Sequence, residues 1–389
     1  MADEWDIRDN IIGTCFDTTA SNTGAYQGAA VLIESMLNRP LLYLGCRHHH
    51  TELHIKHSWI ALHGERDRPE EPLFKQFQKA YPSFHIDYSN LGFFEWPSEE
   101  DSNVWIQAKY VLIWAEKCLQ DEAFPRSDYR ELLELTIVYL GGEVDRFRFQ
   151  KPGACHHARF MSQAIYLLKI ELLSNLFQMS PEDRRAVHRM ANFISLFYAK
   201  LFLRSRIAVF APTDDFHFLS AMEWYKEEDF QIATAVTASV KRHLWYLTEE
   251  LVILALFNKS LSHFTRSRLA QTLFNTPRPT SFAIGKSNFA RIAENMPTFL
   301  HDFIGPRSWL FFSLLKLNNP QDWLQLPPQY WNLMTDYRFA RDFAKILEVT
   351  NDCAERGVKL FGDVLALNKD EKQWQYLLQV VEDHLKNFL

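Results

Sequence analysis

Carboxylates stand at two places in the sequence where they could hold a metal ion. Asp17 ends a short apolar segment and is followed by small and polar residues, which leave room for a ligand. Late in the chain, Asp352 and Glu355 are three residues apart with Arg356 beside them, as in an acid pair with a positioning arginine. Each carboxylate also suits a local role, because aspartate and glutamate favour turns and helix starts. The residues alone leave metal binding and capping both open.

Histidines are concentrated after Cys46, in the segment CRHHHTELHIKH. On a helix, His50, His54 and His57 share one face, and Cys46 precedes them by one turn. A zinc site needs three or four Cys or His ligands that converge on one point. No CxxC or HExxH pattern accompanies the cluster. Residues 155–157 (Cys-His-His) could complete a site in space, but we expect packing or hydrogen-bonding histidines and no zinc.

An alternation of strands and helices must position Asp17 and the histidines. We predict strands over residues 11–16 and 41–44, a helix over residues 25–37 between them, and a second helix from Cys46 onward. Two strands joined through a helix are expected to run parallel. In open α/β sheets, function collects at the carboxyl ends of the strands, which is where Asp17 and Cys46 lie. This stretch is therefore the strongest local indication of a site.

The remainder of the chain predicts helices. Residues 64–103 suggest an irregular connection with one helix near 73–80, and helical spacing dominates from residue 104 onward. One apolar stripe is expected to be buried, and it consists of Val104, Ala108, Val111, Leu112 and Ala115. The chain shows no fixed-period repeat that would indicate a solenoid.

Several polar residues predict where helices begin and end. Ser127 is expected to cap one helix and Gly141 to end it. Ser180, followed by proline and two acids, is expected to start another. Residues 151–177 predict one long apolar helix, and the two glutamates at 249–250 are interpreted as first-turn acids with a structural role.

Composition limits the class of protein. The chain is 47% hydrophobic and contains 31 Phe and 11 Trp, which favours large helix-packed cores. A net charge of -6 argues against a nucleic-acid binder with a wholly basic surface, although it allows a local basic groove. We expect no transmembrane span and no signal peptide, because apolar windows are short and the N-terminus is polar. Five scattered cysteines indicate free thiols in a reducing compartment.

Four short motifs follow one another along the chain. They are residues 16–22 (FDTTASN), Cys46-x-x-His49, residues 158–162 (ARFMS) and residues 354–358 (AERGV). In this order they resemble the motifs of hAT-superfamily transposases, with Phe in place of a Trp in the third and Ala in place of a Ser in the fourth. The chain also resembles a group of uncharacterised, transposon-derived animal proteins, through the segments PGACHHARFM, HLWYLTEELV, NDCAERGVKL and KDEKQWQYLLQVVEDH.

The hAT resemblance implies an architecture. The chain is expected to be mostly α, with a small, incomplete RNase H-like α/β core at residues 1–63. A large helical insertion domain would occupy residues 64–345. The helices of residues 346–389 would return to the core and carry the last catalytic carboxylate.

The resemblance also implies a chemistry. Three carboxylates would hold two Mg²⁺ or Mn²⁺ ions for cleavage and transfer of a DNA strand. Asp17 and Glu355 would be two of these catalytic, metal-binding carboxylates. The first carboxylate of the family lies on an earlier strand, and residues 1–16 do not supply it. We therefore expect no efficient catalysis from this chain alone.

Further residues take roles by the same resemblance. Arg47, Arg159 and Arg356 would contact DNA, and Cys46 with His49 would form a structural motif. The resemblance implies a nuclear location, with the cytoplasm as the alternative. DNA, a partner protein and a second copy of the chain are the partners to consider, and no membrane is expected.

Two other hypotheses remain open. The chain could be a non-enzymatic helical protein-interaction scaffold, in which the motif residues serve packing alone. It could also be a zinc-stabilised scaffold that uses Cys46 and His49, which we consider the weakest of the three.

Overall fold

The computed structural model describes residues 6–350, apart from 25–26, 65–70, 122–123, 125, 154–159, 286–293, 295 and 318. By its contacts the chain divides into residues 1–351 and residues 352–389, and the second unit lies outside the described residues. The protein is mostly helical and contains a two-stranded parallel sheet, so the predicted helical class is confirmed. The boundaries expected at residues 63 and 345 stay predictions.

The α/β unit has the predicted order of elements. Strand β1 (Gly13–Phe16) pairs in parallel with β2 (Leu42–Gly45), in a register that sets Gly13 opposite Leu42 and Phe16 opposite Gly45. Helices α1 (Ala20–Thr23) and α2 (Ala29–Leu37) lie between the strands in sequence. The polar segment after Asp17 contains the single turn of α1. The sheet and its parallel direction follow the sequence prediction.

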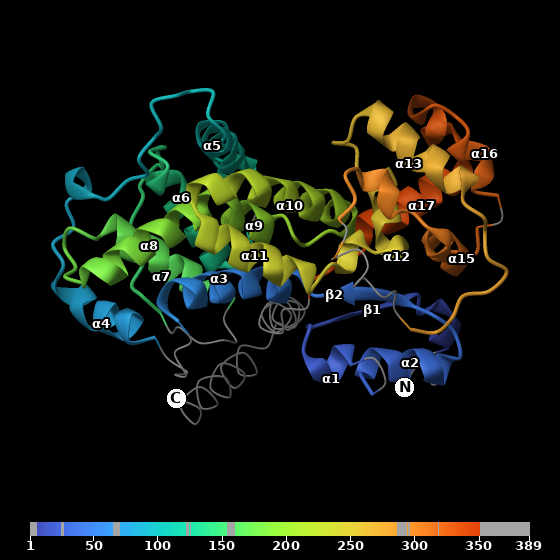
Figure 1. The fold of residues 1–389 in the computed structure, drawn as a ribbon, viewed down its shortest axis with the longest axis horizontal. Coiled ribbons are helices and arrows are strands. Elements are labelled where there is room, and N and C mark those ends of the chain that lie inside the picture. Colours follow the sequence, from blue (N-terminus) through green and yellow to red (C-terminus); the bar gives the residue numbers. More distant parts are fainter. Residues whose placement is uncertain are drawn as a thin grey trace, which may run out of the picture. The chain divides into compact units, whose positions relative to one another are not determined.

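Helix α3 (Arg47–His63) begins directly after β2 and carries the histidines. At 17 residues it is about 25 Å long. It packs against α11 (Phe230–Lys241), α8 (Pro181–Phe193) and α9 (Ala199–Leu203), so it lies between the sheet and the helical part of the chain (Figure 1). Its buried residues include charged and polar side chains, and each of these needs a partner.

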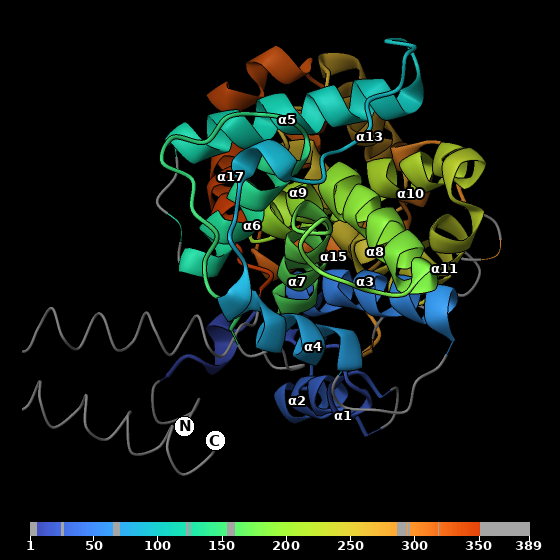
Figure 2. The same cartoon turned by 90° about the vertical axis from the view of Figure 1, so that its left-hand side faces the viewer.

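The first group of helices lies mostly on one side of α3 and is coloured from light blue to yellow in Figure 1. Its remaining members are η2 (Tyr81–Ser83), η3 (Tyr88–Asn90), η5 (Ala208–Phe210), α4 (Pro72–Ala80), α5 (Asn103–Asp121), α6 (Ser127–Tyr139), α7 (Ser162–Leu172), the π-helix η4 (Ile194–Tyr198) and α10 (Ala211–Glu228). A single-turn 3-10 helix, η1 (Arg8–Asn10), precedes β1. Figure 2 shows α5 at the side of this group that is remote from α3.

The second group contains shorter helices around an aromatic core. It comprises η6 (Trp245–Leu247), α12 (Glu249–Val252), η7 (Ile253–Phe257), α13 (His263–Asn275), η8 (Leu300–Phe303), η9 (Pro306–Trp309), α15 (Leu310–Leu314), α16 (Gln321–Leu324), η10 (Pro328–Leu333) and α17 (Thr335–Ile346). Trp323, Trp331 and Tyr337 form a triangle with ring centroids 5.0 to 5.3 Å apart. Arg266 lies over the Trp331 ring and donates to the Tyr337 hydroxyl, so this core contains a satisfied cation.

Most predictions of helix position are confirmed. The apolar stripe of α5 is buried, and the helix expected near residues 73–80 is α4. The Ser180 hydroxyl accepts a hydrogen bond from the Asp183 amide at the start of α8, and Gly141, with φ of 81°, follows α6. The prediction for Ser127 is wrong, because Arg126 precedes the helix and no side chain caps it. The long helix predicted over 151–177 is also wrong, because α7 covers only its central part.

The first-turn acids of α12 have the structural role that the sequence indicated. Glu249 accepts from the Arg307 amide at 3.0 Å, and Glu250 accepts from the Arg307 guanidinium at 2.6 Å. These bonds fasten η9 to the start of α12. In the described part of the chain, no helix is long and apolar enough to cross a membrane.

Candidate functional site at the strand ends

The carboxyl ends of both strands meet at one edge, as the parallel topology requires. The Cys46 amide donates to the Phe16 carbonyl at 2.7 Å. Two residues after Phe16 and three after Cys46, the Thr18 amide donates to Nδ1 of His49 at 3.3 Å. Asp17 therefore lies beside the segment that contains Cys46 and His49. The sequence correctly predicted that these motifs would come together.

Asp17 is held by its own loop. The Thr19 amide, the Thr19 hydroxyl and the Asn22 side-chain amide donate to Oδ1 of Asp17 at 3.1, 2.5 and 2.7 Å. Partial burial raises the pKa of the Asp17 carboxyl, but these hydrogen bonds outweigh it and leave the pKa below its usual value. Asp17 is thus ionised at neutral pH, and it caps the turn that leads into α1. All three described bonds fall on Oδ1, so this geometry agrees with the capping interpretation.

His49 acts as a hydrogen-bond acceptor at this edge. Burial lowers the pKa of the His49 imidazole; the Asp17 charge opposes this effect and Lys56 reinforces it. A neutral imidazole that accepts at Nδ1 carries its proton on Nε2. Cys46, fully buried, is the residue before the first turn of α3. The Thr18–His49 bond gives His49 a structural part at this edge, joining the end of β1 to α3.

Arg47 lies in the protein interior, which corrects the prediction that it contacts DNA. Its side chain is 1% exposed and donates to Asp215 on α10 at 2.6 Å, with the guanidinium 5.2 Å from the centroid of the Tyr246 ring. The Tyr246 hydroxyl in turn donates to the Gly45 carbonyl at 2.6 Å. A guanidinium in this position cannot reach a phosphate. Arg47 instead ties the junction of β2 and α3 to the helical part of the chain.

The histidines of α3 pack and form hydrogen bonds, as expected. His48 stacks on Phe202, with ring centroids 4.2 Å apart. His54 and His57 both face the Ser239 hydroxyl of α11, with Nδ1 to Oγ distances of 3.3 and 2.9 Å. Within the described residues, no group of three or more His, Cys, Asp or Glu side chains is arranged to hold a metal ion. Cys155, His156 and His157 lie outside those residues.

The chain returns to the strand edge after the helical part. The Arg47 amide, at the start of α3, donates to the Val349 carbonyl at 2.9 Å. The Val349 amide donates to the Arg206 carbonyl, also at 2.9 Å, and Ile207 forms an antiparallel bridge with Glu348. This return segment, residues 347–349, therefore lies against the first residue of α3. The described residues do not include three of the predicted site residues, which are Arg159, Glu355 and Arg356. They also do not include the neighbouring Asp352.

Two residues that matter at this edge, Asp215 and Lys56, were not among the site residues predicted from the sequence. Asp215 neutralises Arg47, and the two are 168 residues apart, so no local pattern pairs them. Lys56 is an exposed cation two turns along α3 from His49, and its charge acts on the pKa values of both His49 and His57. The helical spacing of Lys56 from His49 is a signal that could have identified it.

Comparison with known proteins does not assign this chain to a family. No family model, curated protein or solved structure matches the chain.

Proposed function

We propose that this chain is a transposase-derived protein whose α/β unit is the remnant of an RNase H-like core, and that it binds DNA without cleaving it efficiently. One observation carries the proposal. The residues that match the hAT motifs after β1 and β2 lie side by side, and the return segment after the helical part meets them at the start of α3. An RNase H-like core with a helical insertion ahead of its last catalytic helix requires such a return. A nuclear location belongs with the proposal.

The described residues do not by themselves form a metal centre. Two-metal catalysis needs several carboxylates that converge on ions roughly 3.5–4 Å apart. Asp17 is ionised and suitable as one ligand, but the described part of the chain contains no group of three or more His, Cys, Asp or Glu side chains that could hold an ion. Glu355 follows the return segment by six residues and is the second ligand in our proposal. The described residues supply no third carboxylate at this site, so we derive no cleavage step.

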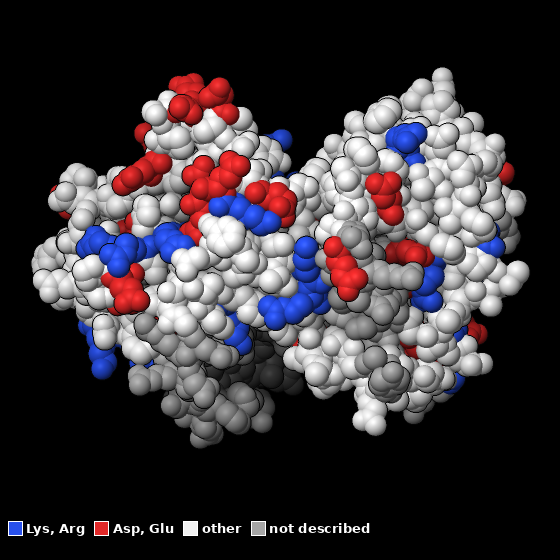
Figure 3. Space-filling view, in the orientation of Figure 1, with Lys and Arg blue, Asp and Glu red and all other residues white. Residues whose placement is uncertain are grey.

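DNA binding in this proposal depends on accessible cations near the strand edge. Because Arg47 is buried, we assign its predicted role in contacting DNA to the exposed Lys56. Arg242 is also exposed, and its charge and that of Lys56 both lower the pKa of His57. The space-filling view shows basic side chains gathered near the C-terminal end of α11, close to where that helix approaches β2 (Figure 3). Arg159 and Arg356 remain in the proposed DNA interface on the resemblance alone.

Salt-dependent binding to a mixed-sequence DNA duplex tests the proposal. We expect fluorescence anisotropy to show binding that weakens linearly in a log–log plot against salt concentration, with a slope of about -0.9 for each phosphate contacted. The double variant Lys56→Glu/Arg242→Glu should reduce that slope by about 2. The matched control is Lys109→Glu/Lys117→Glu, which reverses two exposed lysines on α5, remote from α3 (Figure 2). Equal losses in both variants, or no binding at low salt, would reject the proposal.

Metal binding is tested separately with Mn²⁺, whose free form is measured by electron paramagnetic resonance. If Asp17 and Glu355 share an ion, Asp17→Asn and Glu355→Gln should each weaken Mn²⁺ binding at least tenfold. Asp101→Asn, at an exposed acid, is the control. Unchanged Mn²⁺ binding in both site variants would show that the two carboxylates do not form a common site.

A helical protein-interaction scaffold is the second candidate, and particular observations favour it. Asp17 is bonded within its own loop and Arg47 is buried against Asp215, so both motif residues have structural partners. A scaffold predicts that Asp17→Ala and Glu355→Ala leave every binding activity unchanged. The DNA-binding experiment distinguishes the two candidates directly.

A further inference from the structure

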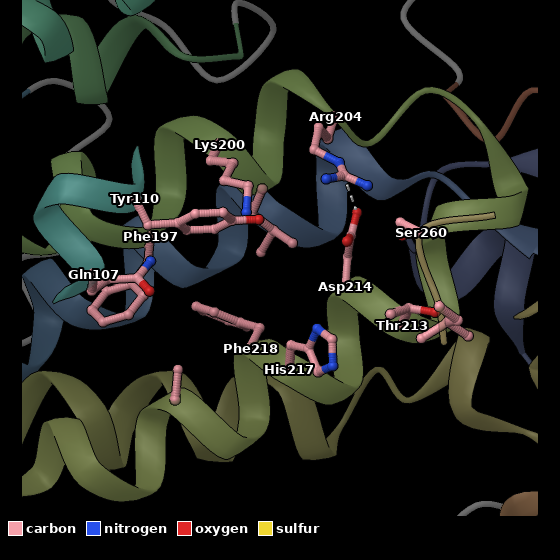
Figure 4. A pocket seen from close by; sticks show the side chains of 13 residues that line it. Gln107, Tyr110, Phe197, Lys200, Arg204, Thr213, Asp214, His217, Phe218 and Ser260 are labelled. Carbon is pink, nitrogen blue, oxygen red and sulfur yellow. Dashed lines mark ion pairs between the residues drawn. The ribbon is translucent and has the colours of Figure 1, made fainter. Parts of the chain in front are cut away.

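A cavity with a volume of about 420 Å³ lies within the helical part of the chain, between α5, α9 and α10 (Figure 4). This is within the size range of small-molecule sites, roughly 300–1,000 Å³. Its wall includes Phe197, from the π-helix η4, and π-helical turns occur frequently at functional sites. The strand edge described above contributes no residue to it.

Lys200 is the residue of this cavity that indicates a bound ligand. Its ammonium group lies 3.8 Å from the centroid of the Tyr110 ring. Burial lowers the pKa of Lys200, an effect that the Tyr110 hydroxyl and the more remote Asp214 charge only partly oppose. Within the described residues, the ion pairs of the protein do not include Lys200. A half-buried ammonium beside a cavity and without a carboxylate partner favours an anion.

A second cation faces the same cavity. Arg204, one helical turn after Lys200, is 3.5 Å from Asp214 and lies over the Phe210 ring (Figure 4). Burial also lowers the pKa of His217, so its imidazole is neutral at pH 7. Two cations and one carboxylate leave a net charge of +1 in the cavity wall. One negative charge on a ligand would balance it.

Part of the wall is apolar, beside the polar side chains of Gln107, Thr213 and Ser260. Phe197 and Phe218 present aromatic rings toward the space, as Figure 4 shows, and small or aliphatic side chains complete this side. Leu201, Ala221 and Leu261 are those side chains. Tyr110 lines the cavity and is 50% exposed, so the cavity extends to the protein surface. An apolar body would therefore displace water from one side of the cavity while its charged end remained at Lys200.

We propose that this cavity binds a small amphipathic anion. The carboxylate or phosphate of the ligand would contact Lys200 and Arg204, and its aliphatic or aromatic body would lie against Phe197 and Phe218. The same geometry accepts either head group, because both are oxyanions that a lysine and an arginine can bind. The proposal is independent of any DNA-related function.

Isothermal titration with matched probes tests the charge requirement. Octanoate and 1-octanol share an apolar chain and differ in charge, and phenyl phosphate tests the alternative head group. We expect octanoate or phenyl phosphate to bind the full-length protein at least tenfold more tightly than 1-octanol. Binding of neither anion at millimolar concentration, or equal binding of octanoate and 1-octanol, would overturn the proposal.

Variants locate the site. Lys200→Gln should abolish the preference for the anion, and Lys200→Arg should restore it. Lys117→Gln, at an exposed lysine of α5, should leave it unchanged. Ala221→Phe fills the cavity without altering charge and should weaken all probes at least tenfold. Circular dichroism confirms that each variant is folded. An anion preference that survives Lys200→Gln, or probe binding that survives Ala221→Phe, would place binding elsewhere and reject this site.

Discussion

The buried histidines of α3 make a quantitative prediction about stability in acid. Burial lowers the pKa values of His48 and His54 from 6.5 to about 3, and that of His50 well below 6.5. In the unfolded chain each imidazole regains a pKa near 6.5 and takes up a proton as the pH falls. Between about pH 6.5 and pH 3 the unfolded state therefore binds more protons than the folded state. The free energy of unfolding must fall as the pH falls through this range.

The magnitude follows from the size of the shift. At pH 5 each buried imidazole lowers the free energy of unfolding by about 2 kcal/mol, since one pKa unit corresponds to about 1.4 kcal/mol. Three of them cost about 6 kcal/mol, which is comparable to the whole stability of an ordinary domain, about 5–15 kcal/mol. His188 acts in the opposite direction. Its hydrogen bond to Glu171 raises the pKa of His188, so its stabilisation is complete below pH 6.5 and is lost as the pH rises through its folded pKa. Burial also raises the pKa values of Glu34, Glu52 and Asp215, which oppose the loss on acidification. It lowers the pKa values of His49, His57 and His217, which add to the loss. The three buried imidazoles therefore contribute about 6 kcal/mol to a sum that contains changes of both signs.

Urea unfolding at pH 7 and pH 5 measures this loss. His54→Gln removes one titrating imidazole, so the difference in unfolding free energy between the two pH values should shrink by about 2 kcal/mol, whatever the variant's stability at pH 7. His85→Gln, at an exposed histidine, is the control and should leave the difference unchanged. A pH dependence in His54→Gln as large as that of the unaltered protein would refute the reasoning.

Three further predictions concern packing and hydrogen bonding, two at the strand edge and one in the second helical group. Arg47→Ala should destabilise the protein by about 3–5 kcal/mol in urea unfolding, because it leaves Asp215 buried without its partner, and Arg47→Met/Asp215→Leu should recover most of that loss. Trp331→Ala should cost about 3–5 kcal/mol by opening the aromatic core of the second helical group, and a change below 1 kcal/mol would show that the ring is not tightly packed. His49→Ala should cost about 1 kcal/mol and should speed hydrogen exchange at the Thr18 amide, whereas unchanged exchange would disprove the hydrogen bond.

Local features of the fold were predictable because their causes are local. The Ser180 start of α8 and the buried stripe of α5 follow from a side chain and its neighbours within one or two turns. The parallel strand pair follows from an intervening helix that leaves no room for a hairpin. The prediction that Ser127 caps α6 was wrong. Serine is favoured before a helix but is also tolerated inside its first turn, which is where Ser127 lies.

Features that depend on distant partners were not predictable in the same way. Nothing in the sequence around Arg47 shows that Asp215 will neutralise it, so an accessible DNA contact was a reasonable but wrong expectation. The cavity at Lys200 presents the same difficulty. Helical spacing places Lys200 and Arg204 on one face, and Asp214 and His217 on another, but no pattern shows that these faces enclose a space with α5. The tertiary arrangement determines both results.

The return segment has a consequence for the order of folding. The Arg47–Val349 and Val349–Arg206 hydrogen bonds join backbone groups that are far apart along the chain. Closing a flexible loop of about 300 residues costs about 5 kcal/mol in chain entropy. A single backbone hydrogen bond contributes only about 1 kcal/mol, so this segment cannot dock before the helical part has brought its two ends together. Docking of residues 347–349 is therefore a late, high-contact-order event, and this segment should be among the first to detach when the native protein opens locally.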